Sequence, residues 1–378
     1  MTLLGGKGKP MKRSLLVATV VASALSGPVS ASMPAGASVY PGSNGKIVFS
    51  QFFADDFVDS FTINPDGTGL TQLGPAGTTY CGDNNEPWSP DGATVVCAEF
   101  DAQGNAHTAT VDSSGSNYAV LSNPKLPTNF ACGSWSPVGT RLLCPFTSDG
   151  LYTVKPNGTG LLQLTTATLA GEGPSGYAND GSHAYFTTED QNDFRTLYSV
   201  RTDGSGGLTV LSPPTVSAHD NSYFDGVSAD SSPDGSQVVF AADTTGFQRA
   251  IFIVNIDGTG LHKIKLPAGI NPTSAQWSPD GKWIAFSGRP PTLNAYFEVY
   301  LVHPDGTGLK EITPHTGGCL GFAPIWSPDG AKLLFARQCY VGLTVVSTSL
   351  STVNLDGTGL SKVTDLNGLT SYGWGTAG

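Results

Sequence analysis

The feature that most constrains this chain is a Trp-Ser-Pro-Asp-Gly string that recurs along it. Full copies begin at Trp88, Trp277 and Trp326. In each copy, proline presets φ near about −65°, aspartate can hydrogen-bond its own backbone, and glycine accepts a positive φ. An alternating apolar run follows the turn, as in residues 283–287. Each copy therefore predicts a tight β-hairpin.

Weaker copies of the same turn bring the number of repeats to seven. The turn glycines recur every 42 to 54 residues or so, at roughly the period of a propeller repeat. They are Gly45, Gly92, Gly139, Gly181, Gly235, Gly281 and Gly330. A second turn string, Asp-Gly-Thr-Gly-Leu, follows within the repeats, as at Asp66 and Asp257. Each repeat thus contains four strands, which is typical of one β-propeller blade. We expect an all-β fold, a seven-bladed β-propeller of four-stranded antiparallel blades spanning residues 40–378.

The carboxyl terminus repeats the beginning of the pattern. Trp374 and Gly378 are spaced like the Trp and Gly of the full copies, whereas the first repeat lacks an innermost strand of its own. We therefore expect Ser371–Trp374 to become the innermost strand of the first blade and to pair with Lys46–Gln51. This C-terminal strand would close the ring and remove its open sheet edges.

The amino terminus reads as a targeting segment. Lys12 and Arg13 precede an apolar run, and small residues end at Ala31. This pattern predicts a cleavable signal peptide over residues 1–31, with Met11 as an alternative start and residues 32–39 as a short linker. The apolar run is too short to span a bilayer, so we expect no membrane insertion. With the first cysteine at Cys81, we expect a secreted, periplasmic or cell-envelope protein rather than a lipoprotein.

Charge limits the partners. The full chain carries a net charge of −11, and the predicted signal peptide contains basic but no acidic residues, so the mature chain is more acidic still. Nucleic acids and anionic membranes require basic surfaces. We therefore expect no nucleic-acid partner, and we expect a monomer.

The six cysteines of an exported chain are expected to pair. Residues that face each other across a blade's first hairpin lie at matching distances on either side of its turn. This rule pairs Cys132 with Cys144 and Cys319 with Cys339. The remaining pair, Cys81–Cys97, misses the register by four residues, so a loop would have to fold back. We predict these three intrablade disulfides.

The two turn strings resemble the PD-type, WD40-like repeats (PD40) of the TolB family over essentially the whole of residues 40–378. The resemblance implies a propeller that binds envelope partners. TolB has a separate amino-terminal domain and six blades, and this chain shows neither, which argues against a role in a Tol–Pal complex. Similar repeats occur in prolyl-oligopeptidase-like peptidases, but no G-x-S-x-G nucleophile elbow is present here.

Candidate binding residues lie on the connections opposite the two short turns, because these connections are long and dissimilar and lie on a rigid scaffold. The candidates are Tyr80, Asp83, Glu86, His219, Asp220, Tyr223, Asp225, Arg289 and His315. A cluster of His, Asp and Asn in residues 216–230 has the side chains that ligate a divalent cation or orient a sugar. No standard metal-binding motif accompanies it, so we predict no cofactor and leave a divalent cation open.

Two functions fit these observations. The first is a non-enzymatic platform that binds an envelope or extracellular protein or glycan. The absence of any catalytic constellation favours it and makes an enzyme the less expected outcome. The second is a metal-dependent carbohydrate lyase or lactonase with its site over the propeller channel. It would require His219, Asp225, Glu86 and His315 to converge.

Overall fold

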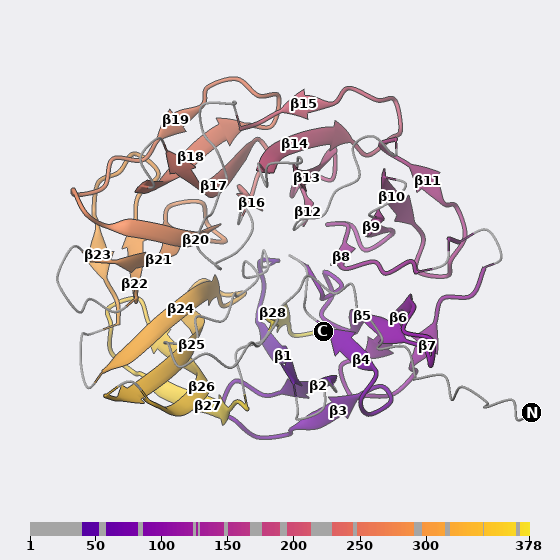
Figure 1. The fold of residues 1–378 in the computed structure, drawn as a ribbon, viewed down its shortest axis with the longest axis horizontal. Coiled ribbons are helices and arrows are strands. Elements are labelled where there is room, and N and C mark those ends of the chain that lie inside the picture. Colours follow the sequence, from indigo (N-terminus) through magenta and orange to yellow (C-terminus); the bar gives the residue numbers. More distant parts are fainter. Residues whose placement is uncertain are drawn as a thin grey trace, which may run out of the picture.

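The computed structural model describes residues 40–52, 58–81, 86–123, 126–127, 129–146, 150–166, 176–189, 195–212, 229–244, 248–290, 297–313, 318–342, 344–367 and 371–378. Its strands form seven four-stranded antiparallel sheets around a central axis (Figure 1), and the residues just named contain no helix. The predicted all-β, seven-bladed β-propeller is confirmed.

Each blade is a meander of four strands, and the blades are numbered in chain order. Blade 1 contains β28 (Tyr372–Thr376), β1 (Asn44–Phe52), β2 (Val58–Ile63) and β3 (Thr71–Leu73); blade 2 contains β4 (Thr79–Cys81), β5 (Thr94–Phe100), β6 (Ala106–Asp112) and β7 (Ala119–Val120); blade 3 contains β8 (Ser134–Trp135), β9 (Leu142–Phe146), β10 (Gly150–Val154) and β11 (Leu162–Gln163); blade 4 contains β12 (Gly176–Tyr177), β13 (His183–Glu189), β14 (Arg195–Arg201) and β15 (Thr209–Val210). Blade 5 contains β16 (Ala229–Ser231), β17 (Gln237–Thr244), β18 (Gln248–Asn255) and β19 (His262–Lys263); blade 6 contains β20 (Asn271–Trp277), β21 (Ile284–Arg289), β22 (Glu298–Val302) and β23 (Lys310–Glu311); blade 7 contains β24 (Cys319–Trp326), β25 (Lys332–Val341), β26 (Thr344–Asn354) and β27 (Ser361–Asp365).

The C-terminal strand closes the ring. β28 pairs antiparallel with β1, so that Phe49 lies opposite Tyr372 and Ile47 opposite Trp374. In Figure 1 the last strand of the chain accordingly lies beside the first. The Tyr372 hydroxyl also donates to the carbonyl oxygens of Phe322 and Ala323 in blade 7. The predicted closure is confirmed, and β28 runs two residues beyond the predicted strand.

The hydrophobic core is divided among the interfaces between neighbouring blades. One buried cluster packs β16 and β17 of blade 5 against β13 and β14 of blade 4, and corresponding clusters fill the other interfaces. The cluster between blades 7 and 1 unites Leu334 and Leu350 with Ile47 and Trp374. Because every blade is covered on both faces, the strands are rich in apolar residues rather than strictly alternating.

The connections fall on two faces. The Pro-Asp-Gly turns join the first and second strands of the blades, and the Asp-Gly-Thr-Gly turns join the third and fourth. In an antiparallel meander both kinds lie at the same end, which we call the turn face. The connections between the second and third strands, and those between blades, lie at the opposite end, the loop face.

All six cysteines form the three predicted disulfides. Cys81–Cys97 and Cys319–Cys339 join the first and second strands of their blades, and Cys132, just before β8, bonds to Cys144 in β9. Cys319 lies directly opposite Cys339. Cys81 lies opposite Cys97 although Trp88 lies opposite Val95. Seven positions separate Cys81 from Trp88 whereas two separate Val95 from Cys97, so the register differs between these two pairings. The predicted fold-back of the intervening loop concerns residues 82–85, which lie outside the described chain.

Candidate binding site at the channel mouth

The Pro-Asp-Gly turns are held by a repeated set of hydrogen bonds. In blade 2, the Ser89 hydroxyl donates to Asp91 Oδ1 over 2.6 Å and accepts the Thr94 N–H over 2.9 Å. Gly92 has φ of 69°, which suits a residue without Cβ. The bond from Ser89 and that from the Ala93 N–H lower the pKa of Asp91. The turn satisfies its own polar groups and leaves its proline at the end of the innermost strand.

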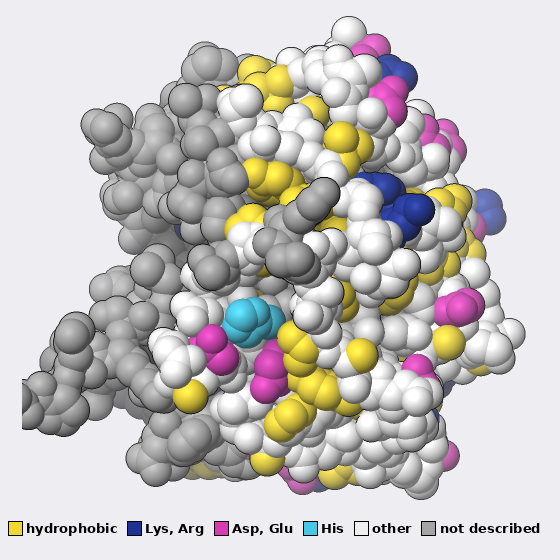
Figure 2. All heavy atoms as spheres, turned by 90° about the vertical axis from the view of Figure 1, so that its right-hand side faces the viewer, with side chains coloured by type: hydrophobic (Ala, Val, Ile, Leu, Met, Phe, Trp, Pro, Cys, Tyr) yellow, Lys and Arg dark blue, Asp and Glu magenta, His cyan; other side chains and the backbone are white. Residues whose placement is uncertain are grey.

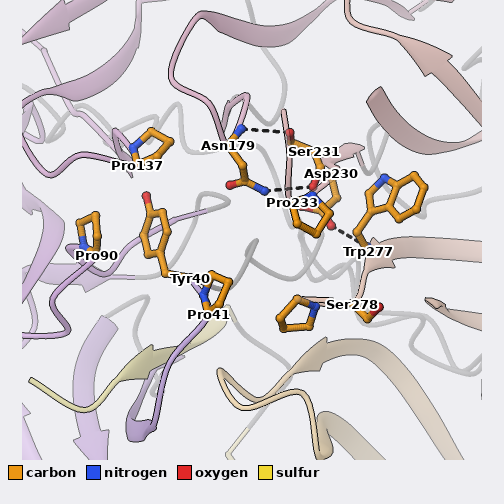
Figure 3. Close-up of a pocket in the computed structure, with 11 residues that line it drawn as sticks. Tyr40, Pro41, Pro90, Pro137, Asn179, Asp230, Ser231, Pro233, Trp277 and Ser278 are labelled. Carbon is orange, nitrogen blue, oxygen red and sulfur yellow. Dashed lines mark hydrogen bonds between the residues drawn. The ribbon is translucent and has the colours of Figure 1, made fainter. Parts of the chain in front are cut away.

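These prolines converge on the axis and line a pocket of about 270 Å³ at the channel mouth on the turn face (Figure 3). The prolines are Pro41, Pro90, Pro137, Pro233 and Pro279. The pocket is completed by Tyr40, Asn179, Asp230, Ser231, Trp277 and Ser278. Blades 2 to 6 and the segment that enters β1 all contribute, so the pocket exists only in the assembled ring.

Tyr40 and Pro41 reach across this mouth. The Tyr40 hydroxyl donates to the Trp135 carbonyl in blade 3 over 2.8 Å, and Gly42 N–H donates to the Pro328 carbonyl in blade 7 over 3.0 Å. In Figure 3 the Tyr40 ring lies between Pro90 and Pro41. Burial, together with nearby Glu86 and Tyr177, raises the pKa of Tyr40 well above its usual value. Tyr40 is therefore a neutral hydrogen-bond donor across the physiological pH range.

The polar groups of the pocket are engaged in holding neighbouring blades together. In blade 4, Asn179 stands where the other turns have proline, and its amide donates to the Ser231 and Ser232 carbonyls of blade 5, each over 3.1 Å. Asp230 Oδ2 accepts the Trp277 N–H of blade 6 over 2.6 Å. The proline rings and the Tyr40 ring supply the rigid apolar part of the lining.

Three of the nine predicted binding residues lie in the described chain. Tyr80 is 8% exposed within β4, and Arg289 is exposed at the end of β21. Glu86 is 2% exposed and lies near Tyr40, so it belongs to the channel. Tyr80 and Glu86 belong to blade 2 and Arg289 to blade 6. The other six, Asp83, His219, Asp220, Tyr223, Asp225 and His315, lie outside the described residues, so their convergence stays a prediction.

Sequence reasoning missed Tyr40, Asn179 and Asp230. The replacement of a turn proline by Asn179 was the available signal, because a repeat that departs from its own consensus at one position marks a different contact there. Among the described residues, no group of three or more His, Cys, Asp or Glu side chains is arranged to hold a metal ion. No helix in that part of the chain is long and apolar enough to cross a membrane.

The coloured flank of the ring in Figure 2 shows acidic and basic side chains dispersed among uncharged ones. No large basic patch is visible on that flank among the residues drawn in colour. The turn face adds carboxylates, one in most turns, and each accepts hydrogen bonds within its own turn, as Asp257 does from Thr259.

The fold and the repeated turns together define a TolB-like, seven-bladed β-propeller with a pocket at its channel mouth. The chain is similar to TolB from Acinetobacter baumannii, at 15% identity and a TM-score of 0.50, over 87% of this chain and 82% of that one. An oligogalacturonate lyase from Vibrio parahaemolyticus is also similar, at 15% identity and a TM-score of 0.57, over 86% of each chain.

A third similar structure is the β-propeller domain of the Trilobed protease from Pyrococcus furiosus, at 12% identity and a TM-score of 0.57, over 89% of this chain and 99% of that one. That propeller is described as having an open velcro topology, whereas β28 and β1 pair here. No protein-family model matches the chain, and no curated protein matches it. At these identities the likeness shows the fold alone.

Proposed function

We propose that this chain is an exported, non-enzymatic binding platform that takes a segment of an envelope or extracellular protein into the channel mouth. The single observation that carries the proposal is the pocket of about 270 Å³ on the axis. Its volume suits one or two side chains of a partner rather than a large ligand. Partner residues around that anchor would contact the surrounding turns.

The lining favours a protein over a glycan. A sugar needs several hydrogen-bond donors and acceptors aimed into the site, whereas Asn179 and Asp230 are engaged with neighbouring blades. Proline rings and the Tyr40 ring offer rigid, apolar contact, which suits an apolar or aromatic side chain. A glycan bound on the loop face is the other form of the same platform.

Export is part of the proposal. Three disulfides are typical of proteins in oxidising compartments, and the TolB-like fold is compatible with a periplasmic or secreted location. We place the protein there as a monomer, delivered by the predicted signal peptide and without a lipid anchor, membrane insertion or nucleic-acid partner.

The second candidate is a metal-dependent lyase or lactonase. The similarity in fold to an oligogalacturonate lyase supports it. It would use His219, Asp225, Glu86 and His315 around a divalent cation over the channel. Of these, the structure describes only Glu86. Metal analysis of the purified protein separates the candidates, because stoichiometric Mn, Ca or Zn together with sugar cleavage would favour the enzyme.

The platform is tested by photo-crosslinking from the pocket rim in the native host. A benzophenone amino acid replaces Pro90, and the pocket is filled by Pro137→Trp, with the adjacent Val138→Trp as matched control because Val138 is 71% exposed and does not line the pocket. We expect one defined protein adduct that falls at least about tenfold with Pro137→Trp and persists with Val138→Trp. An adduct that Pro137→Trp leaves unchanged would contradict the site. So would an adduct that forms only when the benzophenone amino acid replaces Arg289, which lies on the loop face.

A further inference from the structure

Blade 7 departs from the other blades in the length of its central hairpin. β25 has ten residues and β26 has 11, whereas the second and third strands of the other blades have five to nine. At the turn face, β25 begins and β26 ends at about the same positions of the repeat as the second and third strands of blades 2 to 6. The extra length therefore lies at the loop face. We call residues 340–342 and 344–347 the blade-7 ribbon.

The ribbon is apolar and exposed. Val341 is 70% exposed, Val345 38% and Val346 56%, which places three of the nine exposed large hydrophobic side chains of the described chain within six positions. The sequence from Gln338 to Asn354 contains no charged residue, although 13% of the chain is charged. Scattered surface valines need no explanation, but a contiguous group on one projection does.

One edge of the ribbon has no strand of the described chain beside it. β25 lies on one side of β26, and β27 on the other side pairs only with residues from Ser349 onward. The last contact on that side is Leu366 N–H donating to the Thr348 carbonyl. Among the described residues, no strand pairs with Thr344–Ser347 there. The backbone N–H and C=O groups of this edge can therefore extend the sheet.

The base of the ribbon is rigid. Cys319–Cys339 links β24 to β25 at the level where Cys339 lies opposite Ser347. Just inside it, Gln338 donates to the Thr348 hydroxyl and accepts from the Tyr340 hydroxyl. A fixed base lowers the entropy that an edge strand loses when another strand pairs with it.

We propose that the open edge of β26 at Thr344–Ser347 is a docking site for an extended, uncharged segment of a partner protein, which adds to blade 7 as a further strand. Native edge strands are usually protected by charged residues or proline, and this edge has neither. An edge of this kind binds through main-chain hydrogen bonds, and side-chain contacts select the sequence. A charge opposite Val345 or Val346 would lose water without gaining a partner, so the segment must be uncharged there.

A second copy of this chain fits less well. Self-pairing would join two four-residue edges, and so short a contact falls well below the roughly 1,000 Å² that a stable interface buries. An extended peptide needs less, because only its own backbone must be ordered and no second propeller has to be oriented. The site lies on the loop face, so it does not depend on the channel-mouth proposal.

The test uses a phage-displayed library of random 12-residue peptides, panned on the full mature chain and counter-selected on Val346→Lys. Both that variant and the control, Val138→Lys on the turn face, change highly exposed valines and should fold normally. We expect enriched peptides rich in Val, Ile and Thr and free of charge. The synthetic consensus peptide should slow amide hydrogen exchange at Thr344–Ser347 by about tenfold or more and should bind Val346→Lys about tenfold more weakly. Binding to Val138→Lys should match the unmodified chain.

Three results would overturn the proposal. The first is a selection in which no enriched peptide binds the Val346→Lys variant more weakly than the unmodified chain. The second is enrichment of charged peptides, or of peptides that leave exchange at Thr344–Ser347 unchanged. The third is concentration-dependent dimerisation that Val346→Lys abolishes, which would assign the edge to a second copy.

Discussion

The Pro-Asp-Gly turns and the blade-7 ribbon are both ends of β-hairpins, yet they meet solvent in opposite ways. At the turn of blade 7, the Ser327 hydroxyl donates to Asp329 Oδ1 and accepts the Lys332 N–H, so the hairpin end is closed on itself. At the other end of β25, where it pairs with the start of β26, Val341 and Val346 are exposed beside an edge that no strand of the described chain covers.

The difference shows which parts of the molecule stabilise the fold and which parts leave surface exposed that a partner could contact. Repetition of the turn secures the ring, because every copy places the same hydrogen bonds at the same point of a blade. Departure from repetition in the ribbon creates surface that the fold itself does not require. A rigid scaffold with local departures is the usual arrangement of a binding protein.

The largest effect should come from opening the ring. Deletion of residues 368–378 removes β28 and with it the buried side chains Tyr372 and Trp374. Loss of one large core side chain costs about 3–5 kcal/mol, so we expect the melting temperature to fall by at least about 10 °C. Deletion of Ala377 and Gly378 alone should have a much smaller effect. Thermal unfolding followed by circular dichroism makes the measurement, and an unchanged melting temperature would contradict the closure.

Next in size is the contrast between two disulfides. Cys132 and Cys144 are buried in the interface between blades 2 and 3, whereas Cys319 and Cys339 are partly exposed. We expect the double alanine variant of the first pair to lose about 3 kcal/mol of unfolding free energy. The same change in the second pair should lose less, because the ribbon can loosen locally, and should speed amide exchange at residues 340–347. Equal losses of unfolding free energy in the two variants, with unchanged amide exchange in the ribbon, would contradict the expected difference between the two disulfides.

The repeats explain why so much of the architecture could be predicted from the sequence. Turn chemistry is local, so Pro-Asp-Gly marks a hairpin wherever it occurs, and its period sets the blade. Closure followed from a single truncated copy at Trp374. The Cys81–Cys97 bridge was predicted against the simple register, because the other four cysteines satisfied the register and left this pair.

The pocket and the ribbon could not be predicted in the same way. The pocket depends on prolines from several blades meeting on one axis and on Tyr40 crossing between blades, which are long-range consequences of the ring. The ribbon depends on where pairing stops, and β-propensity alone does not report the end of a neighbouring strand. Its uncharged sequence from Gln338 onward was visible, but the exposure of Val346 was not.

Acid should weaken the turn face more than the ribbon. Hydrogen bonds from Ser232 and from the Ser236 N–H lower the pKa of Asp234, and the corresponding bonds from Ser89 and the Ala93 N–H lower that of Asp91. A carboxylate with a lowered folded pKa stabilises the fold above its unfolded pKa of about 3.9 and loses that contribution as the pH falls through the folded pKa.

We therefore expect the urea midpoint to fall steadily below about pH 4. Asp91→Asn and Asp234→Asn together should make that fall shallower, and Val346→Lys should leave the acid slope unchanged. Urea titrations at a series of pH values provide the measurement. An acid slope that the two turn substitutions do not alter would show that carboxylates elsewhere dominate acid unfolding.

The smallest effect compares one serine near each end of β25, Ser327 in the turn before it and Ser347 on β26 opposite Cys339. Ser327→Ala removes the buried hydroxyl that accepts the Lys332 N–H, so we expect a loss of about 1–2 kcal/mol. Ser347→Ala changes an exposed ribbon residue and should alter the unfolding free energy by less than about 0.5 kcal/mol. Chemical denaturation of the two variants side by side measures the difference. Equal losses would mean that the ribbon is held as firmly as the turn. In blade 7, the contrast between a hairpin end whose polar groups are hydrogen-bonded within the turn and one with an open edge would then be wrong.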